Sequence, residues 1–461
     1  MKARLLNCGL VVLLATAGCA SIEIEVDSSA PRPQPYASTY DPPAAPPVVI
    51  ENATILTGTG ERLDGASLVL ADGRIAALGS AVDVPAEARR IDASGRWVTP
   101  GIIDIHSHLG VYPSPGLRAT QDGNEATASV TAQVWAEHSI WTQDPGFSRA
   151  LAGGVTSLMI LPGSANLIGG RGVTVKNVPA RSVRGMKFPG APHTLKMACG
   201  ENPKRVYGGR RQFPSTRMGN FAGYRKAWIE AQEYQRKWRR YRSGKSSGSG
   251  PPKRDLGLET LVGVLEGEVL VHNHCYRGEE MAWMLDLAEE FGYRVTAFHH
   301  AVEAYKVADL LADKEVCAAM WADWWGFKLE AFDGIRENIA LVDHAGGCAI
   351  VHSDSDQGIQ RLNQEAAKAM AAGNRIGLEI SRREAIRWIT SNAAQAVGIA
   401  DETGSLEVGK AADVVIWSSD PFSVYALAEQ VFIDGVARFE RGNRELQPLS
   451  DFELGLTEGG P

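Results

Sequence analysis

The sequence has few cysteines, no membrane-length apolar run near its start and no excess of positive charge, and each absence excludes a class of protein. Its six cysteines contain no CxxC pair, which argues against a structural zinc site. The apolar residues 5–14 are too few to span a hydrocarbon core of ~30 Å. A formal net charge of −7 does not suit a nucleic-acid-binding protein. The hydrophobic content of 44% is that of an ordinary folded protein.

The first residues have the features of a secretion signal. A basic start precedes the apolar residues 5–14, and the sequence TAGC then ends at Cys19. TAGC resembles the lipobox of bacterial lipoproteins, which implies a signal peptide over residues 1–19 and a lipid on the Cys19 thiol. By the same resemblance, Ala20 after the cysteine favours the outer membrane of the cell envelope, facing the periplasm. The alternative is an ordinary secretory signal that is cleaved nearby.

Both ends of the mature chain have a β-rich texture. Residues 20–47 are rich in proline and predict an extended linker. Residues 48–98 show short apolar alternation broken by glycine, and residues 403–445 repeat this pattern. We therefore predict one small β-sandwich domain built from both chain ends, followed by a tail over residues 446–461.

The middle of the chain, residues 99–402, alternates between apolar strand candidates and helical stretches. Parallel strands buried on both faces give such near-continuous apolar runs. Seven or eight such units predict an α/β fold, a (β/α)₈ TIM barrel. Residues 203–260 interrupt this rhythm with a basic helix that carries an aromatic stripe. The stripe would pack on the barrel, which is compatible with a lid over the active site; contact with a membrane surface is the alternative.

Histidines gather where the predicted barrel strands end. In a (β/α)₈ barrel the carboxyl ends of all strands meet at one mouth, so residues far apart in sequence come together there. Imidazole and carboxylate groups are common ligands of Zn²⁺ and similar metals. The residues concerned are His106, His108, His272, His274, His299, His300, His352 and Asp354. Four such clusters at four strand ends predict a metal site at the mouth.

Several longer motifs resemble one known family. VTPGIIDIHSHL resembles the first-strand signature of the amidohydrolase superfamily, in its imidazolonepropionase-like and metal-dependent dipeptidase branch. GSLEVGKAADVVIWSSDPF resembles the C-terminal return of that branch into its β-sandwich, and LVHNHCYR, FHHAVEAY and AIVHSDS take the fifth, sixth and eighth strand positions. The resemblance covers nearly all of the mature chain, apart from the linker and the insertion.

The resemblance implies a set of metal ligands. His106, His108 and Asp354 would bind a first divalent ion, and His272 and His300 would bind a second ion or complete a single site. Zinc is the expected metal, with Mn, Fe or Co as alternatives, and one or two ions per chain.

The resemblance also implies a bridging group. Lys196 lies where two-metal members carry a carbamylated lysine, a modification that the sequence cannot show. Glu201 is the alternative bridging carboxylate, and a structural or substrate-facing lysine is the other interpretation of Lys196.

Other residues have less determined roles. Asp354 would act as the catalytic acid and base, and His274 would polarise the substrate or support a ligand. If His300 is a ligand, strand alternation predicts that His299 points away, with the roles exchanged if the register slips by one. Basic loops at the mouth would hold a substrate carboxylate through Arg171, Lys176, Lys204 and Arg210. Trp321, Trp324 and Trp325 would line an apolar pocket or simply pack.

We therefore expect an enzyme that cleaves an amide-type C–N bond of a small molecule, such as a dipeptide or an N-acyl amino acid, with metal-activated water. A single-metal, imidazolonepropionase-like hydrolase of cyclic amides is one alternative, and a non-catalytic, lipid-anchored binding protein is another. The expected partners are a small-molecule substrate and, through the lipid, a membrane; nucleic acid is not expected, and oligomer formation is left open. Four cysteines in or beside the predicted strands are expected as buried free thiols, namely Cys199, Cys275, Cys317 and Cys348.

Overall fold

The structure is a computed structural model that describes residues 30–32, 35–245 and 250–446. The predicted signal peptide with Cys19 and nearly all of the predicted tail lie outside these residues. Within the described ranges, none of the helices combines the length and the apolar content that a membrane crossing requires.

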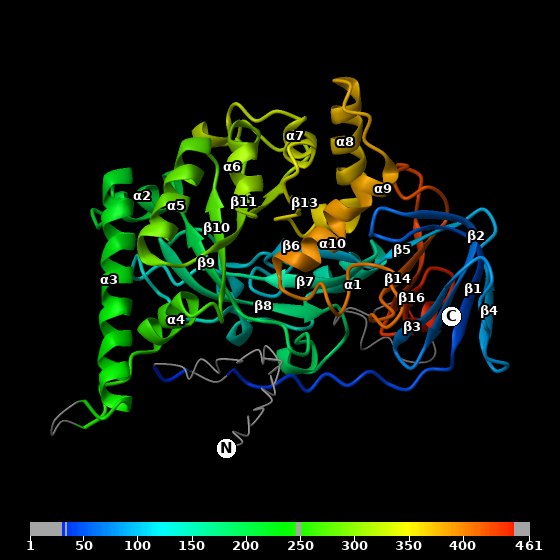
Figure 1. The fold of residues 1–461 in the computed structure, drawn as a ribbon, viewed down its shortest axis with the longest axis horizontal. Coiled ribbons are helices and arrows are strands. Elements are labelled where there is room, and N and C mark those ends of the chain that lie inside the picture. Colours follow the sequence, from blue (N-terminus) through cyan, green and yellow to red (C-terminus); the bar gives the residue numbers. More distant parts are fainter. Residues whose placement is uncertain (1–29, 33–34, 246–249, 447–461) are drawn as a thin grey trace, which may run out of the picture.

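The centre of the molecule is an eight-stranded sheet that curls into a nearly closed barrel, in the order β13-β12-β11-β10-β9-β8-β7-β6 (Figure 1). Its strands are β6 (Ile102–Ser107), β7 (Val155–Ile160), β8 (Ile168–Lys176), β9 (Thr194–Ala198), β10 (Leu270–Cys275), β11 (Val295–His300), β12 (Cys317–Met320) and β13 (Ala349–Val351). These strands are buried almost throughout, which explains why their sequences are apolar on both faces. The predicted TIM barrel is confirmed as an eight-stranded barrel with surrounding helices, but its strict alternation of strand and helix is not, because no helix separates β7 from β8.

One strand of the barrel runs against the others. β8 pairs antiparallel with both β7 and β9, whereas the other neighbours in the barrel are parallel. The sequence GGRGVTVKN, predicted as a loop at the mouth, forms most of this strand and is buried. That prediction was wrong because glycine usually weakens a strand, so the glycines and the lack of a long apolar run indicated a loop. In this strand, glycine is required because neighbouring backbone lies too close for a side chain. A Cβ at Gly170 would lie 2.3 Å from the carbonyl oxygen of Val134.

Helices cover the outside of the barrel and follow its strands. They are α1 (Pro145–Ala152), α2 (Glu201–Gly208), α3 (Arg217–Arg242), α4 (Leu256–Leu265), α5 (Gly278–Phe291), α6 (Ala308–Asp313), α7 (Asn338–His344), α8 (Leu362–Arg375), α9 (Arg382–Ala385) and α10 (Ser391–Ala396). A short 3-10 helix, η2 (Ala136–His138), lies in the long connection between β6 and β7.

The aromatic stripe of α3 faces the protein interior, as the packing interpretation predicted. Tyr224, Trp228 and Ala231 are fully buried and belong to the same core as the barrel strands. Trp228 stacks on Tyr293 with ring centroids 4.4 Å apart. In Figure 1, α3 stands along the side of the barrel.

Both chain ends contribute to a second sheet beside the barrel. Its order is β16-β15-β14-β5-β1-β2-β3, with β4 beside β1. The strands are β1 (Val48–Leu56), β2 (Arg62–Ala71), β3 (Arg74–Gly79), β4 (Arg89–Asp92), β5 (Trp97–Pro100), β14 (Val414–Trp417), β15 (Ala428–Ile433) and β16 (Val436–Glu440). The antiparallel pairing of β14 with β5 joins the two ends of the chain, and the sheet has an apolar core of its own.

The end of the predicted linker lies against the barrel. Ala30 is buried, Arg32 forms ion pairs with Glu266 and Glu268, and the backbone N–H of Thr39 donates to a carbonyl of the barrel domain at 2.9 Å. In Figure 1 the segment up to residue 47 runs along the lower side of the barrel towards the second sheet. Residues 35–47 form no helix or strand, and the composition did not indicate their contact with the barrel.

The four barrel cysteines form two disulfides, so the prediction of free thiols was wrong. Cys199 is bonded to Cys275, with their Cα atoms 5.2 Å apart, and Cys317 is bonded to Cys348, with their Cα atoms 4.4 Å apart. Each bond links neighbouring parallel strands near one of their ends. Strand adjacency, which brings Cα atoms within bonding range, was not visible in the spacing of the cysteines.

Candidate active site

The first and last barrel strands meet through a set of hydrogen bonds at the mouth. The backbone N–H of Asp354 donates to the carbonyl oxygen of His106 at 3.0 Å, and that of Ser353 donates to Asp104 Oδ1 at 3.2 Å. Asp354 has a φ of 51°, in the left-handed region that carboxylate and amide residues tolerate better than most. The turn after β13 thereby holds the Asp354 carboxylate over the end of β6.

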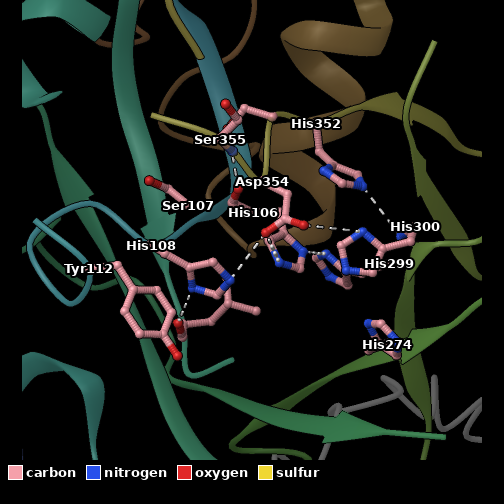
Figure 2. A network of polar contacts seen from close by, with 12 residues as sticks. His106, Ser107, His108, Tyr112, His274, His299, His300, His352, Asp354 and Ser355 are labelled. Atoms are coloured by element: carbon pink, nitrogen blue, oxygen red, sulfur yellow. Dashed lines mark hydrogen bonds and ion pairs between the residues drawn. The ribbon is translucent and has the colours of Figure 1, made fainter. Parts of the chain in front are cut away.

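Two histidines of β6 and its end point at this carboxylate, as Figure 2 shows. Asp354 Oδ1 lies 3.4 Å from His106 Nε2 and 3.3 Å from His108 Nε2. His108 Nδ1 lies 2.9 Å from the carbonyl oxygen of Leu161, which can only accept, so this nitrogen carries the proton and Nε2 keeps its lone pair. The predicted trio His106, His108 and Asp354 is thus brought together, with ligand atoms within 4.8 Å of one another.

A second group of side chains lies on the other side of the carboxylate. His300 Nδ1 is 3.9 Å from Asp354 Oδ2, and His106, His300 and His352 also bring ligand atoms within 4.8 Å of one another. His300 has a φ of 68°, so the chain leaves the extended conformation at the end of β11. Because of this turn, His299 and His300 both face the barrel interior, and the prediction that one would point away was wrong.

A line of three imidazoles runs from the site into the barrel. His272 Nε2 lies 3.0 Å from the carbonyl oxygen of Ala396, the last residue of α10, and therefore donates to it. His272 Nδ1 then accepts from His299 Nε2 at 2.7 Å, and His299 Nδ1 accepts from His106 Nδ1 at 2.8 Å. If all three rings are neutral, this order leaves the lone pair of His106 on Nε2, the atom that faces Asp354.

Burial keeps these rings neutral. It holds the pKa of His106 and of His299 well below the ordinary value, and together with the charge of Lys196 it lowers the pKa of His272 to about 3. His272, predicted as a metal ligand, does not belong to the cluster, because its two ring nitrogens are hydrogen-bonded to His299 and to the carbonyl oxygen of Ala396. Its geometry is that of a group that orients a ligand.

The cluster fits a divalent cation. Two imidazole lone pairs lie 3.4 and 3.3 Å from one carboxylate oxygen with no donor between them, an arrangement that repels unless a cation or a proton intervenes. His106 Nε2 and His300 Nδ1 are buried and have no hydrogen-bond partner. Buried polar atoms normally have hydrogen-bond partners, so these two unpartnered nitrogens fit the role of metal ligands.

Lys196 lies inside the barrel on β9, in register with His272 on β10. Its Nζ is buried without a hydrogen-bond partner, and burial lowers its pKa to about 7. A large fraction of the amine is then neutral near pH 7, the form that can add carbon dioxide to become a carbamate. Glu201, the alternative bridging residue, begins α2 and belongs to neither group of ligand atoms.

A third set of side chains fixes His274. Lys328 Nζ donates to Asn202 Oδ1 at 2.9 Å, which orients the Asn202 amide so that its Nδ2 donates to His274 Nε2 at 3.3 Å. Neutral His274 therefore carries its proton on Nδ1, which has no partner. Lys328 Nζ also lies 3.1 Å from Tyr276 Oη, whose ring contacts His274 at 4.5 Å between centroids.

Two of the four predicted carboxylate-binding residues lie away from the mouth. Arg171 and Lys176 are buried on β8, where Arg171 bonds to Thr260 and Lys176 pairs with Asp413 and Asp434 of the second sheet. Both corrections follow from β8 being a strand. Arg210 is exposed and donates to a backbone carbonyl, and Lys204 is partly exposed on α2.

Two residues of the site were not assigned a role from the sequence. His352 was noted only as a histidine at a strand end, yet its Nε2 accepts the backbone N–H of His300 at 3.3 Å. Lys328 had no motif to mark it, because it enters the site from the irregular connection after β12. Trp321 from the same connection covers the site, stacked on His300 with ring centroids 4.3 Å apart, whereas Trp324 and Trp325 are exposed.

A barrel whose strand ends carry a histidine–aspartate cluster defines a hydrolase of the TIM-barrel type, and the comparisons give its family. The amidohydrolase family matches residues 303–438. A crystal structure of an amidohydrolase from Thermotoga maritima is 34% identical, covers 86% of this chain and all of its own, and superposes with a TM-score of 0.78. The chain belongs to the amidohydrolase family.

Two further relatives are matched over different shares of their own length. Amidohydrolase tasK of Hapsidospora irregularis is 35% identical over 379 residues, which make up 78% of this chain but only 38% of tasK. Imidazolonepropionase of Mesorhizobium japonicum is 26% identical over 75% of this chain and 84% of its own. The prediction of the amidohydrolase superfamily is confirmed.

Proposed function

We propose that this amidohydrolase hydrolyses an amide-type C–N bond in a small molecule, with a divalent metal at the barrel mouth. The observation that carries the proposal is the convergence of His106 and His108 on Asp354, with their Nε2 atoms 3.4 and 3.3 Å from one carboxylate oxygen. A hydrolase relative that the chain covers along its whole length supports it.

The residues that would hold the first ion are His106, His108 and Asp354. His300 and a carbamylated Lys196 would hold a second, while His272 acts through His299 on His106. A divalent ion in this place supplies Lewis acidity, which polarises a carbonyl and lowers the pKa of water towards ~7. Zinc suits a set of imidazole and carboxylate ligands.

Asp354 is the group that moves the proton. Burial raises the pKa of its carboxyl, but the neighbouring groups, first His108 and then His352 and Lys196, outweigh this and hold the pKa below the ordinary value. The carboxylate is therefore ionised at neutral pH and takes a proton from the attacking water. The water oxygen bonds to the carbonyl carbon, the C–N bond breaks, and the proton passes from Asp354 to the leaving nitrogen.

His274 is placed to polarise the substrate. Its Nδ1–H has no partner within the described protein, and its tautomer is fixed by Asn202. Burial keeps the pKa of His274 well below the ordinary value, so the ring donates as a neutral group. Such a donor would stabilise the negative charge that develops on the carbonyl oxygen.

The mouth favours a substrate with a carboxylate and an apolar body. Lys328 is a half-buried cation beside Tyr276, and Trp321 offers an apolar surface over His300. A dipeptide or an N-acyl amino acid has both features, with the carboxylate placed at Lys328. A cyclic amide, as in imidazolonepropionase, is the second candidate, since that enzyme is among the relatives.

Metal analysis and one pair of variants test the proposal. The purified protein should contain about one or two equivalents of zinc or a related metal, and Asp354→Asn should lower the turnover of a chromogenic N-acyl amino acid by about 10²–10⁴-fold. Asp356→Asn, on the same turn, is the matched control and should keep its activity. A protein that binds no metal after reconstitution, and whose substrate screen gives the same result with Asp354→Asn, would instead be a binding protein without catalysis.

We further propose that the protein is anchored in the cell envelope by a lipid on Cys19. Two disulfides suit an oxidising compartment such as the periplasm. Expression in a Gram-negative host with labelled palmitate tests this, because the wild type should take up label in the membrane fraction and Cys19→Ser should not. Equal membrane association of the two without label would indicate an uncleaved signal.

A further inference from the structure

The outside of the barrel wall holds a second cavity, away from the mouth. It has a volume of about 480 Å³ and lies between Arg32 with residues 35–38 on one side and the starts of β9 and β10 on the other. Its charged lining residues are Arg32, Arg171, Lys187 and Glu268, and the neutral His193 lies beside them. On β8 the neighbours of Arg171, Gly170 and Gly172, pair with Lys196 and Thr194 of β9, so Arg171 alternates to the opposite, outer face of the wall.

Arg171 is a buried cation without an ion-pair partner. It is 4% exposed, and among the described residues its guanidinium has a single hydrogen bond, from Nε to Thr260 Oγ1 at 3.0 Å. Nη2 is buried with no partner, and the ring of Trp135 lies 4.5 Å from the guanidinium carbon. A buried charge is costly unless an opposite charge compensates for it.

The carboxylates near Arg171 are already held by other cations. Glu137 binds Lys187 at 2.7 Å and Glu268 binds Arg32 at 2.7 Å. Glu259 is held by two nitrogens of Arg254, at 2.8 and 2.7 Å. None of the three forms an ion pair or a hydrogen bond with Arg171, so they compensate its charge only from a distance.

A second cation, Lys187, and a neutral histidine, His193, also line the cavity. Lys187 is 7% exposed and lies between Glu137 and the carbonyl oxygen of Tyr36, to which it donates at 2.8 Å. His193 is 8% exposed, its Nε2 lies 3.4 Å from Glu137, and its Nδ1 has no partner. Apolar side chains, Phe188 and Val269 among them, line the remainder.

We propose that this cavity is a binding site for a small organic anion, a carboxylate with an apolar body, whose charge is compensated by Arg171. The volume is that of a ligand pocket rather than of a single-ion site. An arginine bonds a carboxylate through two parallel N–H groups, and the apolar lining accommodates the rest of the molecule. The site is separate from the hydrolytic centre and does not depend on the proposed reaction.

Titration of the metal-loaded protein with benzoate, followed by calorimetry, tests the site. In the Lys328→Met variant, which lacks the cation proposed to hold a carboxylate at the mouth, benzoate should still bind with a stoichiometry of about one, and benzamide, of the same shape but without charge, should not bind measurably. Arg171→Gln should weaken benzoate binding by about ten- to a hundredfold, whereas Arg210→Gln, an exposed arginine elsewhere, should not change it. Inorganic phosphate serves as a second probe, and tighter binding of phosphate than of benzoate would overturn the assignment to carboxylates.

A second variant keeps the test valid if Arg171→Gln does not fold. Ala37→Trp changes an exposed lining residue and should fill the cavity without disturbing the barrel. It should abolish benzoate binding, while Lys328→Met at the mouth should leave it intact. No benzoate binding to the wild type, or binding lost in Lys328→Met and retained in Ala37→Trp, would refute the outer site.

Discussion

Replacing His299 with phenylalanine removes the central ring of the line that ends at Ala396. The substitution is close in shape and leaves His106, His108 and Asp354 in place. Two hydrogen bonds are lost, at 2.8 Å to His106 and 2.7 Å to His272. The proton of His106 is then no longer held on Nδ1, and the ring gains access to the tautomer with Nε2 protonated, which cannot bind a metal.

The expected effect is a loss of metal affinity. Two neutral hydrogen bonds contribute together about 1–3 kcal/mol, which corresponds to about a 5- to 150-fold weaker dissociation constant. This range agrees with the 10- to 100-fold typical of groups that orient metal ligands. Competition with a chromophoric chelator at fixed pH measures the dissociation constant directly.

A folded His299→Phe protein that binds metal as tightly as the wild type would refute the hydrogen-bonded order along the line. His138→Phe is the matched control, since its side chain is 55% exposed and lies outside both ligand groups. His272→Phe should have a smaller effect than His299→Phe, because it leaves the bond between His299 and His106 intact.

Three further predictions concern other parts of the molecule. The Cys199→Ser/Cys275→Ser double variant should lose roughly 2–5 kcal/mol of unfolding free energy in denaturant titrations, because the bond closes a loop of 76 residues; a change below about 1 kcal/mol would contradict it. Burial alone would raise the pKa of Glu137, but His193 and Lys187 lower it to about 2, so this carboxylate stabilises the folded state above pH ~4.5 and the effect is lost as the pH falls towards 2. Glu137→Gln should therefore cost about 3 kcal/mol at pH 7 and nothing at pH 2, and a cost independent of pH would refute the shift. Lys328→Met should raise the KM for a carboxylate-bearing substrate by about tenfold and leave that of its neutral amide unchanged; equal changes would place the carboxylate elsewhere.

The sequence was sufficient for the features that depend on periodicity and on strand ends. Apolar runs located the barrel strands, and the convergence of strand ends predicted that His106, His108 and Asp354 would meet. These inferences rest on general properties of parallel sheets, which leave little freedom once the strands are identified.

The reversed strand could not be predicted in the same way. Its glycines are typical of a loop, because glycine does not stabilise an isolated strand. They are needed only in the assembled barrel, where neighbouring backbone and side chains leave no room for a Cβ. A Cβ at Gly172 would lie 2.5 Å from Thr194 Oγ1. The position of Arg171 and Lys176 follows from that strand, so one error in secondary structure moved both residues from the mouth to other faces.

The histidine pair at the end of β11 shows a different limit. The alternation of side chains between the two faces of a strand requires an extended backbone. The φ of 68° at His300 ends this alternation one residue earlier than the sequence pattern implies. Which of His272 and His274 lies near the mouth, and which bonds to α10, depends on the register of β10 with β9 and β11. Such register is a property of the assembled barrel.

The reversed direction of β8 has a consequence for the order in which the barrel assembles. From β7 to β9 the chain forms three successive antiparallel strands within residues 155–198, joined without any crossover helix. Such pairings close short loops, whereas each parallel pairing elsewhere in the wall must wait for a longer connection to fold. Substitutions within this meander should therefore slow refolding, whereas those between β10 and β13 should mainly speed unfolding. On this view, the strand with the least typical sequence in the barrel belongs to its folding nucleus.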